Sequence, residues 1–165
     1  MTAPRTALAG LLAGGTSLAL LLGALLFQYA GGLSPCEMCI WQRWPHGIAA
    51  VLGLGGYLLC QRALIPPGLA SAMAWLAVVS LAISGAIGVF HAGVEWDWWE
   101  GPAHCTGGGY VPGVTDPFEA FNVVRCDVAE WRLLGLSLAG YNALISFAVA
   151  AAALALGRAK GEGRR

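Results

Sequence analysis

The stretch ALIPPGLASAMAWLAVVSLAISGAIGVFHAGV, residues 63–94, contains no Asp, Glu, Lys or Arg. A helix needs about 20 apolar residues to cross the hydrocarbon core of a membrane. Residues 6–28 and 133–157 are equally free of these charges, and residues 44–61 form a shorter stretch near the lower length limit. The sequence therefore predicts an all-α membrane protein, a four-helix transmembrane bundle.

The composition of the whole chain agrees with this interpretation. Apolar residues make up 58% of the sequence and charged residues 11%, whereas soluble domains carry about 25% charged residues. The first apolar stretch is longer than the core of a secretory signal and shows no cleavage pattern, so we expect it to remain as a span. We expect one membrane domain over residues 1–165, with spans at 6–28, 45–60, 69–91 and 133–156 and external loops at 29–44 and 92–132.

Basic residues fall mainly on one side of these spans. With four spans, both termini and the 61–68 turn share a side, and the two longer loops share the other. The first side carries Arg5, Arg62, Arg158, Lys160, Arg164 and Arg165. The other side carries three arginines and every acidic residue except Glu162. The positive-inside rule therefore predicts cytoplasmic termini and external long loops.

The five cysteines separate into three groups. Cys36 and Cys39 form a Cys-x-x-Cys in the first external loop, Cys105 and Cys126 lie in the second, and Cys60 ends the second span. Proximity favours pairing 36 with 39, which leaves 105 with 126. A disulfide across a two-residue spacer stabilises little, so the first pair is predicted to be redox-active. The second pair could also serve as a staple of its loop.

The residues around the first pair predict a helix start. Ser34, with Glu37 three residues later and Pro35 between them, has the form of a capping box. Cys36 and Cys39 would then lie in the first turns, where free amides and the helix dipole favour thiolate over thiol.

The next residues indicate how this segment joins the membrane. Arg43 follows Cys39 by four positions, which places both on one helical face. Arg43 could reach lipid phosphates or stabilise a thiolate or an anionic ligand, and its spacing from Cys39 favours the second role. Pro45 is expected to kink or end the short helix before the second span.

Other residues on the external side allow more than one interpretation. His91, near the end of the third span, could be an interfacial hydrogen-bonding group or part of a site. On the opposite side, Cys60 is interpreted as a small buried hydrophobe. Aromatic residues of the long loop could form a membrane-interface belt or contact an aromatic ligand or a partner; they are Trp96, Trp98, Trp99, Phe118 and Phe121.

One motif and the order of features resemble a known family. The segment PCEMCIWQR, residues 35–43, joins a Cys-x-x-Cys to an arginine after three residues. It resembles the signature of the bacterial disulfide bond formation protein B family, DsbB. The order of spans, cysteine loops and the segment WRLLGLS at 131–137 is also similar across nearly the whole chain.

The resemblance implies a membrane thiol oxidase of the bacterial inner membrane. Such a protein would reoxidise a periplasmic DsbA-like thiol oxidase, general or specialised, and reduce ubiquinone or menaquinone. By position, Cys105 would form the mixed disulfide with the partner and Cys126 would be its companion. Cys39 of the inner pair would face the quinone, with Arg43 and His91 beside it. A glycine run at 107–109, which departs from the family pattern, is expected to act as a flexible hinge.

Three other interpretations compete with this one. A quinone-linked enzyme of the vitamin K epoxide reductase type carries its Cys-x-x-Cys late in the chain, whereas here it follows the first span. A metal-binding membrane protein could use Cys36, Cys39, His104 and Cys105, a ligand set that suits Zn²⁺. A structural membrane protein would use its disulfides only to hold the loops.

Overall fold

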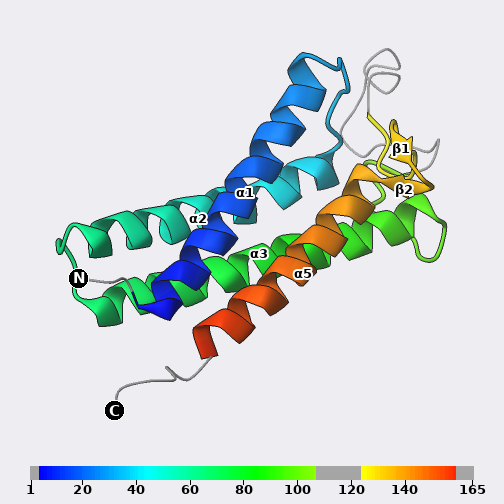
Figure 1. The fold of residues 1–165 in the computed structure, drawn as a ribbon. Coiled ribbons are helices and arrows are strands. Elements are labelled where there is room, and N and C mark those ends of the chain that lie inside the picture. Colours follow the sequence, from blue (N-terminus) through cyan, green and yellow to red (C-terminus); the bar gives the residue numbers. More distant parts are fainter. Residues whose placement is uncertain (1–3, 107–123, 159–165) are drawn as a thin grey trace.

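The computed structural model describes residues 4–106 and 124–158. Within them the chain forms four helices and one two-stranded sheet, in the order α1, α2, α3, β1, β2 and α5 (Figure 1). The helices are α1 (Arg5–Tyr29), α2 (Glu37–Gln61), α3 (Pro67–Glu95) and α5 (Leu138–Arg158). The strands are β1 (Arg132–Leu133) and β2 (Leu136–Ser137). The expected all-helical character is confirmed.

Three of these helices, α1, α3 and α5, are long and apolar enough to cross a membrane. The chain is thus a membrane protein, as its composition predicts. Helix α2 has the same 25-residue length as α1, but its first turns carry Glu37, Gln42 and Arg43. These polar groups make the first turns of α2 less apolar than the rest of the helix. The expected span begins after them, at residue 45.

The start of α2 differs from the expected one. Its N-cap is Cys36, whose sulfur accepts a hydrogen bond from the Cys39 amide, so the predicted cap at Ser34 is wrong. Pro45 is expected to kink or end the helix, and the structure excludes an end there, because α2 continues through this residue. Proline removes one hydrogen bond, but α2 packs against both α1 and α3, and contacts with neighbouring helices allow a membrane helix to keep an internal proline.

The last helix begins at residue 138 instead of the expected 133, because a hairpin precedes it. Leu133 of β1 pairs with Leu136 of β2 in an antiparallel register. The two residues between them, Leu134 and Gly135, have φ values of 51° and 84°. Two successive residues in the left-handed region are typical of a tight hairpin turn, and the turn holds β1 against the start of α5.

Small residues bring the helices close together, and Gly10 and Gly14, four positions apart on α1, are two of them. A Cβ atom added at Gly14 would lie 2.8 Å from the backbone nitrogen of Leu54 on α2, so α1 and α2 can touch only through glycine here. The buried centre of the bundle consists mostly of alanine: Ala9, Ala13, Ala49, Ala77, Val78, Leu81, Ala150 and Ala153. Close backbone contact of this kind is common between membrane helices.

The two ends of the bundle differ in content (Figure 1). The start of α1, the turn between α2 and α3 and the end of α5 lie at one end. The start of α2, the end of α3 and the β1–β2 hairpin lie at the opposite end. Cys36, Cys39, Cys105 and Cys126, the four cysteines of the two loops predicted to be external, belong to this second end, together with Arg43 and His91.

Candidate active site

Cys105 and Cys126 form a disulfide, with Cα atoms 5.3 Å apart. The predicted pairing is therefore confirmed. The Cys126 amide also donates to the Cys105 carbonyl oxygen at 2.6 Å. Both residues are buried, with 4% and 0% of their surface exposed, so the disulfide is closed to solvent in this conformation. The glycine run expected to act as a hinge, residues 107–109, lies outside the described residues.

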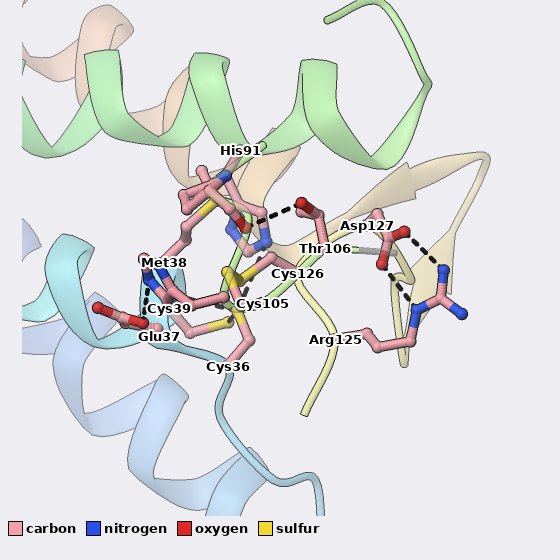
Figure 2. Close-up of a disulfide and its surroundings, with 12 residues drawn as sticks. Cys36, Glu37, Met38, Cys39, His91, Cys105, Thr106, Arg125, Cys126 and Asp127 are labelled. Atoms are coloured by element: carbon pink, nitrogen blue, oxygen red, sulfur yellow. Dashed lines mark hydrogen bonds and ion pairs between the residues drawn. A yellow bond between two sulfur atoms is a disulfide. The ribbon is translucent and has the colours of Figure 1, made fainter. Parts of the chain in front are cut away.

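Cys36 and Cys39 lie directly beside this disulfide (Figure 2). Their Sγ atoms are 2.6 Å apart, which is well inside van der Waals contact and close enough for a disulfide to form with little movement. Cys36 is buried and Cys39 is partly exposed. The two cysteine pairs share one apolar cluster with Met38 and Val94, and thiol–disulfide exchange between two pairs requires such proximity.

The pKa of the Cys36 thiol is shifted in the direction opposite to the expected one. A hydrogen bond with the Cys39 sulfur, and then burial, raise the pKa of the Cys36 thiol above its ordinary value. The cap position of Cys36 makes its sulfur an acceptor for one helix amide, but this is outweighed by the neighbouring sulfur. For Cys36 the prediction that the helix start favours thiolate is therefore wrong.

His91 lies next to the inner pair, on α3. Its Nε2 atom is 3.5 Å from the Cys36 sulfur and its Nδ1 atom is 2.9 Å from Nε2 of Gln42. A hydrogen bond also joins its ring to the backbone of Cys126. His91 therefore touches both cysteine pairs, and the structure assigns it to the site and not to the membrane interface.

Arg43 and Cys39 border the same cavity, as their four-residue spacing predicts. The guanidinium of Arg43 donates to Oε1 of Gln28 on α1 at 2.5 Å. Gln28 thus fixes the direction of Arg43, and no sequence pattern identifies this contact because it joins two different helices.

A cavity of about 240 Å³ opens beside these groups. One wall comes from apolar residues of α1, including Leu20, Ala24 and Phe27. Polar residues of the wall near the inner cysteine pair include Cys36, Cys39, Gln42, Arg43, His46, His91, Glu95 and Asn142. The cavity combines a large apolar surface with a few converging polar groups, which is typical of small-molecule sites.

A buried polar network that the sequence does not reveal runs behind this cavity. The Asn142 side chain on α5 donates to Oε1 of Gln42 at 2.8 Å and accepts from Nε2 of His46 at 2.8 Å. Nδ1 of His46 lies 3.3 Å from the Ser17 hydroxyl on α1. The Ser84 hydroxyl on α3 donates to the Gln42 backbone at 2.9 Å. The network joins all four helices of the described chain and ends at His91.

Glu95, the last residue of α3, is the second unforeseen group. Its side chain is 5% exposed and its Oε1 lies 3.7 Å from Nε2 of His91. A hydrogen bond with Ser137 of β2 and the charge of Arg132 on β1 also act on the carboxyl. Its other oxygen, Oε2, is buried and has no hydrogen-bond partner among the described residues.

The proposed metal ligands do not come together as one set. Cys105 is bonded to Cys126, and His104 forms an ion pair with Glu37. The groups whose donor atoms lie within 4.8 Å of one another are Cys36, Cys39 and His91, and separately Glu37, His104 and Cys105. Cys60, the last cysteine, is half-buried near the end of α2, which places it at the opposite end of the bundle.

The tryptophans after α3 lie mostly at the surface. Trp98 is 64% exposed, and Trp99 donates from its indole nitrogen to the Phe90 carbonyl oxygen at 2.8 Å and stacks on the Phe90 ring. These rings do not line the cavity, which favours the interface belt over ligand contact for the described members. Phe118 and Phe121 lie outside the described residues.

Comparisons with known proteins agree with this site. The DsbB family profile, described as disulfide bond formation protein DsbB, matches residues 5–156. The disulfide bond formation protein B of Paracidovorax citrulli (strain AAC00-1) is 30% identical over 161 residues, which cover 92% of this chain and 85% of that protein. No solved structure shows a significant match. The chain therefore belongs to the DsbB family of membrane proteins that act in disulfide bond formation.

Proposed function

We propose that this protein reoxidises a periplasmic DsbA-like thiol oxidase and passes the electrons through its two cysteine pairs to ubiquinone or menaquinone. The observation that carries this proposal is the contact between the Cys105–Cys126 disulfide and the Cys36–Cys39 pair, beside a cavity of about 240 Å³. One pair can exchange with a protein, and the other borders the cavity.

The reaction divides into three exchanges. A thiolate of the partner attacks Cys105, and Cys126 leaves as a thiolate. The second partner thiolate then releases the oxidised partner, which leaves Cys105 and Cys126 reduced. This dithiol reduces a Cys36–Cys39 disulfide, and the resulting inner dithiol transfers two electrons and two protons to the quinone. The sum is one partner disulfide and one quinol, so electrons and protons balance.

The residues of the cavity fit a quinone. A quinone ring presents two carbonyl oxygens that gain negative charge on reduction. Arg43 provides a fixed cation at the wall, and His91 provides ring nitrogens next to the inner pair. The apolar surface from α1 suits the remainder of a lipid-soluble molecule. When bound, the quinone would supply the two-electron acceptor that the inner cysteines need.

Redox potentials explain why such an acceptor is required. DsbA has a potential of about −120 mV, whereas a thioredoxin-type Cys-x-x-Cys has about −270 mV. A pair of the second kind could not oxidise DsbA by itself, because the difference is about 7 kcal/mol in the wrong direction. A quinone supports the reaction by withdrawing electrons from the inner pair.

The expected membrane arrangement follows from the same proposal. All four helices α1, α2, α3 and α5 would span the bacterial inner membrane, with both termini in the cytoplasm and both cysteine pairs at the periplasmic side. Arg5, Arg62 and Arg158 support this orientation, since they belong to the end of the bundle opposite the cysteines. The remaining basic residues used for the prediction, Lys160, Arg164 and Arg165, lie outside the described residues.

The test is quinone reduction by the purified protein in detergent, with reduced DsbA-like protein as electron donor and ubiquinone or menaquinone analogues as acceptors. We expect quinone-dependent oxidation of the donor, and loss of this activity in Cys39→Ser. A folded protein that reduces neither analogue with a competent donor would contradict the proposal.

A further inference from the structure

The buried carboxyl of Glu95 presents an oxygen that its surroundings leave without a partner. Oε2 of Glu95 has no hydrogen-bond partner in the described chain, although the side chain is 95% buried on the basis of its 5% exposure. An unpartnered polar atom in such a place is costly, and exceptions of this kind need an explanation. Glu95 borders the same cavity as Cys36 and Cys39. Its other oxygen, Oε1, lies 3.7 Å from Nε2 of His91, which is itself 3.5 Å from the Cys36 sulfur, so the carboxyl belongs to the candidate active site.

A histidine beside a thiol ordinarily serves as the proton acceptor, and His91 occupies this position next to Cys36. The hydrogen bonds around it exclude this role. Nε2 of Gln42 donates to the Met38 carbonyl oxygen at 3.1 Å, and this oxygen can only accept. The same amide nitrogen therefore donates to Nδ1 of His91, 2.9 Å away.

The opposite side of Gln42 is fixed in the same way. Nδ2 of Asn142 donates to the Ser84 carbonyl oxygen at 3.1 Å, which fixes the orientation of that amide, and it also donates to Oε1 of Gln42 at 2.8 Å. Rotating the Gln42 amide by half a turn would place its oxygen against the Met38 carbonyl oxygen and its NH₂ group against the NH₂ group of Asn142. Nδ1 of His91 is thus held as an acceptor, and the ring hydrogen lies on Nε2. This atom is 3.5 Å from the Cys36 sulfur and 3.7 Å from Oε1 of Glu95, and the backbone of Cys126 accepts a hydrogen bond from the same ring.

A proton on Nδ1 would place two N–H groups against each other at 2.9 Å. His91 is therefore a hydrogen-bond donor through Nε2, and it cannot take the proton of Cys36 on either nitrogen. From this arrangement we propose that Glu95, and not His91, is the proton-accepting group of the inner cysteine pair. The inference rests on the proposed function, and it adds a catalytic residue to it.

The proton transfer balances within one turnover. As the Cys36–Cys39 bond forms, the two thiols lose two protons and two electrons, and the electrons pass to the quinone. One proton moves from Cys36 to the Glu95 carboxylate and then to a quinone oxygen, so that Glu95 returns to its starting state. The other proton passes from Cys39 to the second oxygen. The Nε2 hydrogen of His91, which the Cys126 backbone also accepts, faces the Cys36 sulfur while that sulfur carries charge.

Several titratable groups face Glu95 and enter its pH response. They are His91 on the same helix, Cys36 and Cys39 at the start of α2, and Arg132 on β1. Arg43, His46, Arg125 and Glu130 border the same cavity. The test therefore compares substitutions at the two residues that the inference distinguishes, His91 and Glu95.

The experiment measures quinone reduction from pH 5 to 8 with saturating reduced donor. A carboxylate that must accept a proton loses this ability as it becomes protonated, so the native rate falls toward low pH. We expect Glu95→Gln to lower the rate about 100-fold and to remove this acidic limb. Glu95→Asp should keep the limb, and His91→Gln, which retains an N–H donor, should also keep it at a reduced rate.

Glu100→Gln is the matched control, because Glu100 is an exposed acidic residue just beyond the same helix. It should leave rate and pH profile unchanged. Quinone turnover by the native protein with an unchanged profile in Glu95→Gln would overturn the inference alone. Absence of turnover in the native protein would overturn the proposed function and the inference together.

Nitrogen NMR of histidine-labelled protein supplies a readout that does not depend on turnover. We expect the His91 ring to remain neutral, with its hydrogen on Nε2, throughout pH 5 to 8. The Gln42→Leu variant removes the fixed donor and should allow His91 to titrate. A hydrogen on Nδ1 of His91, or titration of the native ring in this range, would overturn the inference.

Discussion

The Nε2 atom of His91 lies 3.5 Å from the Sγ atom of Cys36, although the two residues are 55 positions apart in the chain. This contact links the third helix to the start of the second at the point where both cysteine pairs meet. The surroundings of the inner pair therefore come from several helices. Substitutions far from Cys36 and Cys39 in the sequence should change the steps in which this pair takes part.

The first prediction concerns the two cysteine pairs. Cys126→Ser should abolish oxidation of the protein donor, because the outer disulfide no longer exists. The inner pair should remain competent: after reduction by a high concentration of dithiothreitol, Cys36 and Cys39 should still transfer electrons to quinone in a single turnover. Thiol counting and quinone absorbance measure the two steps. Loss of both steps in this variant would contradict separate roles for the pairs.

Cys60→Ser is the matched control for cysteine substitutions. Cys60 is half-buried at the end of the bundle away from the site, so its replacement should leave the quinone-dependent rate within about twofold of the native rate, the effect of an ordinary substitution outside the site.

The second prediction concerns the thiol of Cys36. Its pKa is raised chiefly by the hydrogen bond with the Cys39 sulfur, so the fraction of thiolate at neutral pH is small. Cys39→Ala removes this cause, and the pKa of Cys36 should fall toward its ordinary value. The rate of Cys36 alkylation in the reduced protein should therefore rise at a given pH, as peptide mass spectrometry can measure. A slower reaction in the variant would contradict the assignment.

The third prediction concerns Arg43 and its support. Arg43→Met should raise the KM for quinone, because the cavity loses its fixed cation, whereas Arg43→Lys should retain part of the affinity. Gln28→Leu should have a smaller effect in the same direction, because Gln28 holds the guanidinium in place. Steady-state rates at varied quinone concentration provide the measurement. An unchanged KM in Arg43→Met would contradict a role of this residue in quinone binding.

The fourth prediction concerns stability. Asn142→Leu removes the amide between Gln42 and His46 and leaves their polar atoms buried without this partner. Each such atom costs about 1–3 kcal/mol, so thermal unfolding in detergent should shift to a clearly lower temperature. Ser146→Ala, which removes only a hydroxyl that donates to Asn142, should shift it less. Equal melting temperatures for Asn142→Leu and the native protein would contradict a structural role of the network.

The sequence predicts the parts of this protein that local patterns determine. Charge-free stretches locate the helices, and the positions of cysteines in two loops predict the 105–126 disulfide. Arg43 follows from its spacing to Cys39 on one helix, since residues four apart share a face. These features depend on neighbours in sequence or on the membrane itself.

The remainder depends on contacts between helices. The links from Gln42 to His91 and to Asn142 span 49 and 100 positions, and no periodicity reports such contacts. Glu95 looks like an ordinary charged residue beyond a span until the hairpin of β1 and β2 and the ring of His91 bury it. Pro45 illustrates a related point, since local chemistry allows the helix to end there, whereas packing against α1 and α3 continues it.

The burial of the outer disulfide also bears on which reductants can reach it. With both sulfur atoms covered, a small thiol dissolved in the surrounding water finds no surface from which to attack. Under the proposed function, only a partner protein whose docking exposes this bond would reach it. If the proposed function is correct, the closed disulfide would thus protect the quinone from reduction by unspecific thiols.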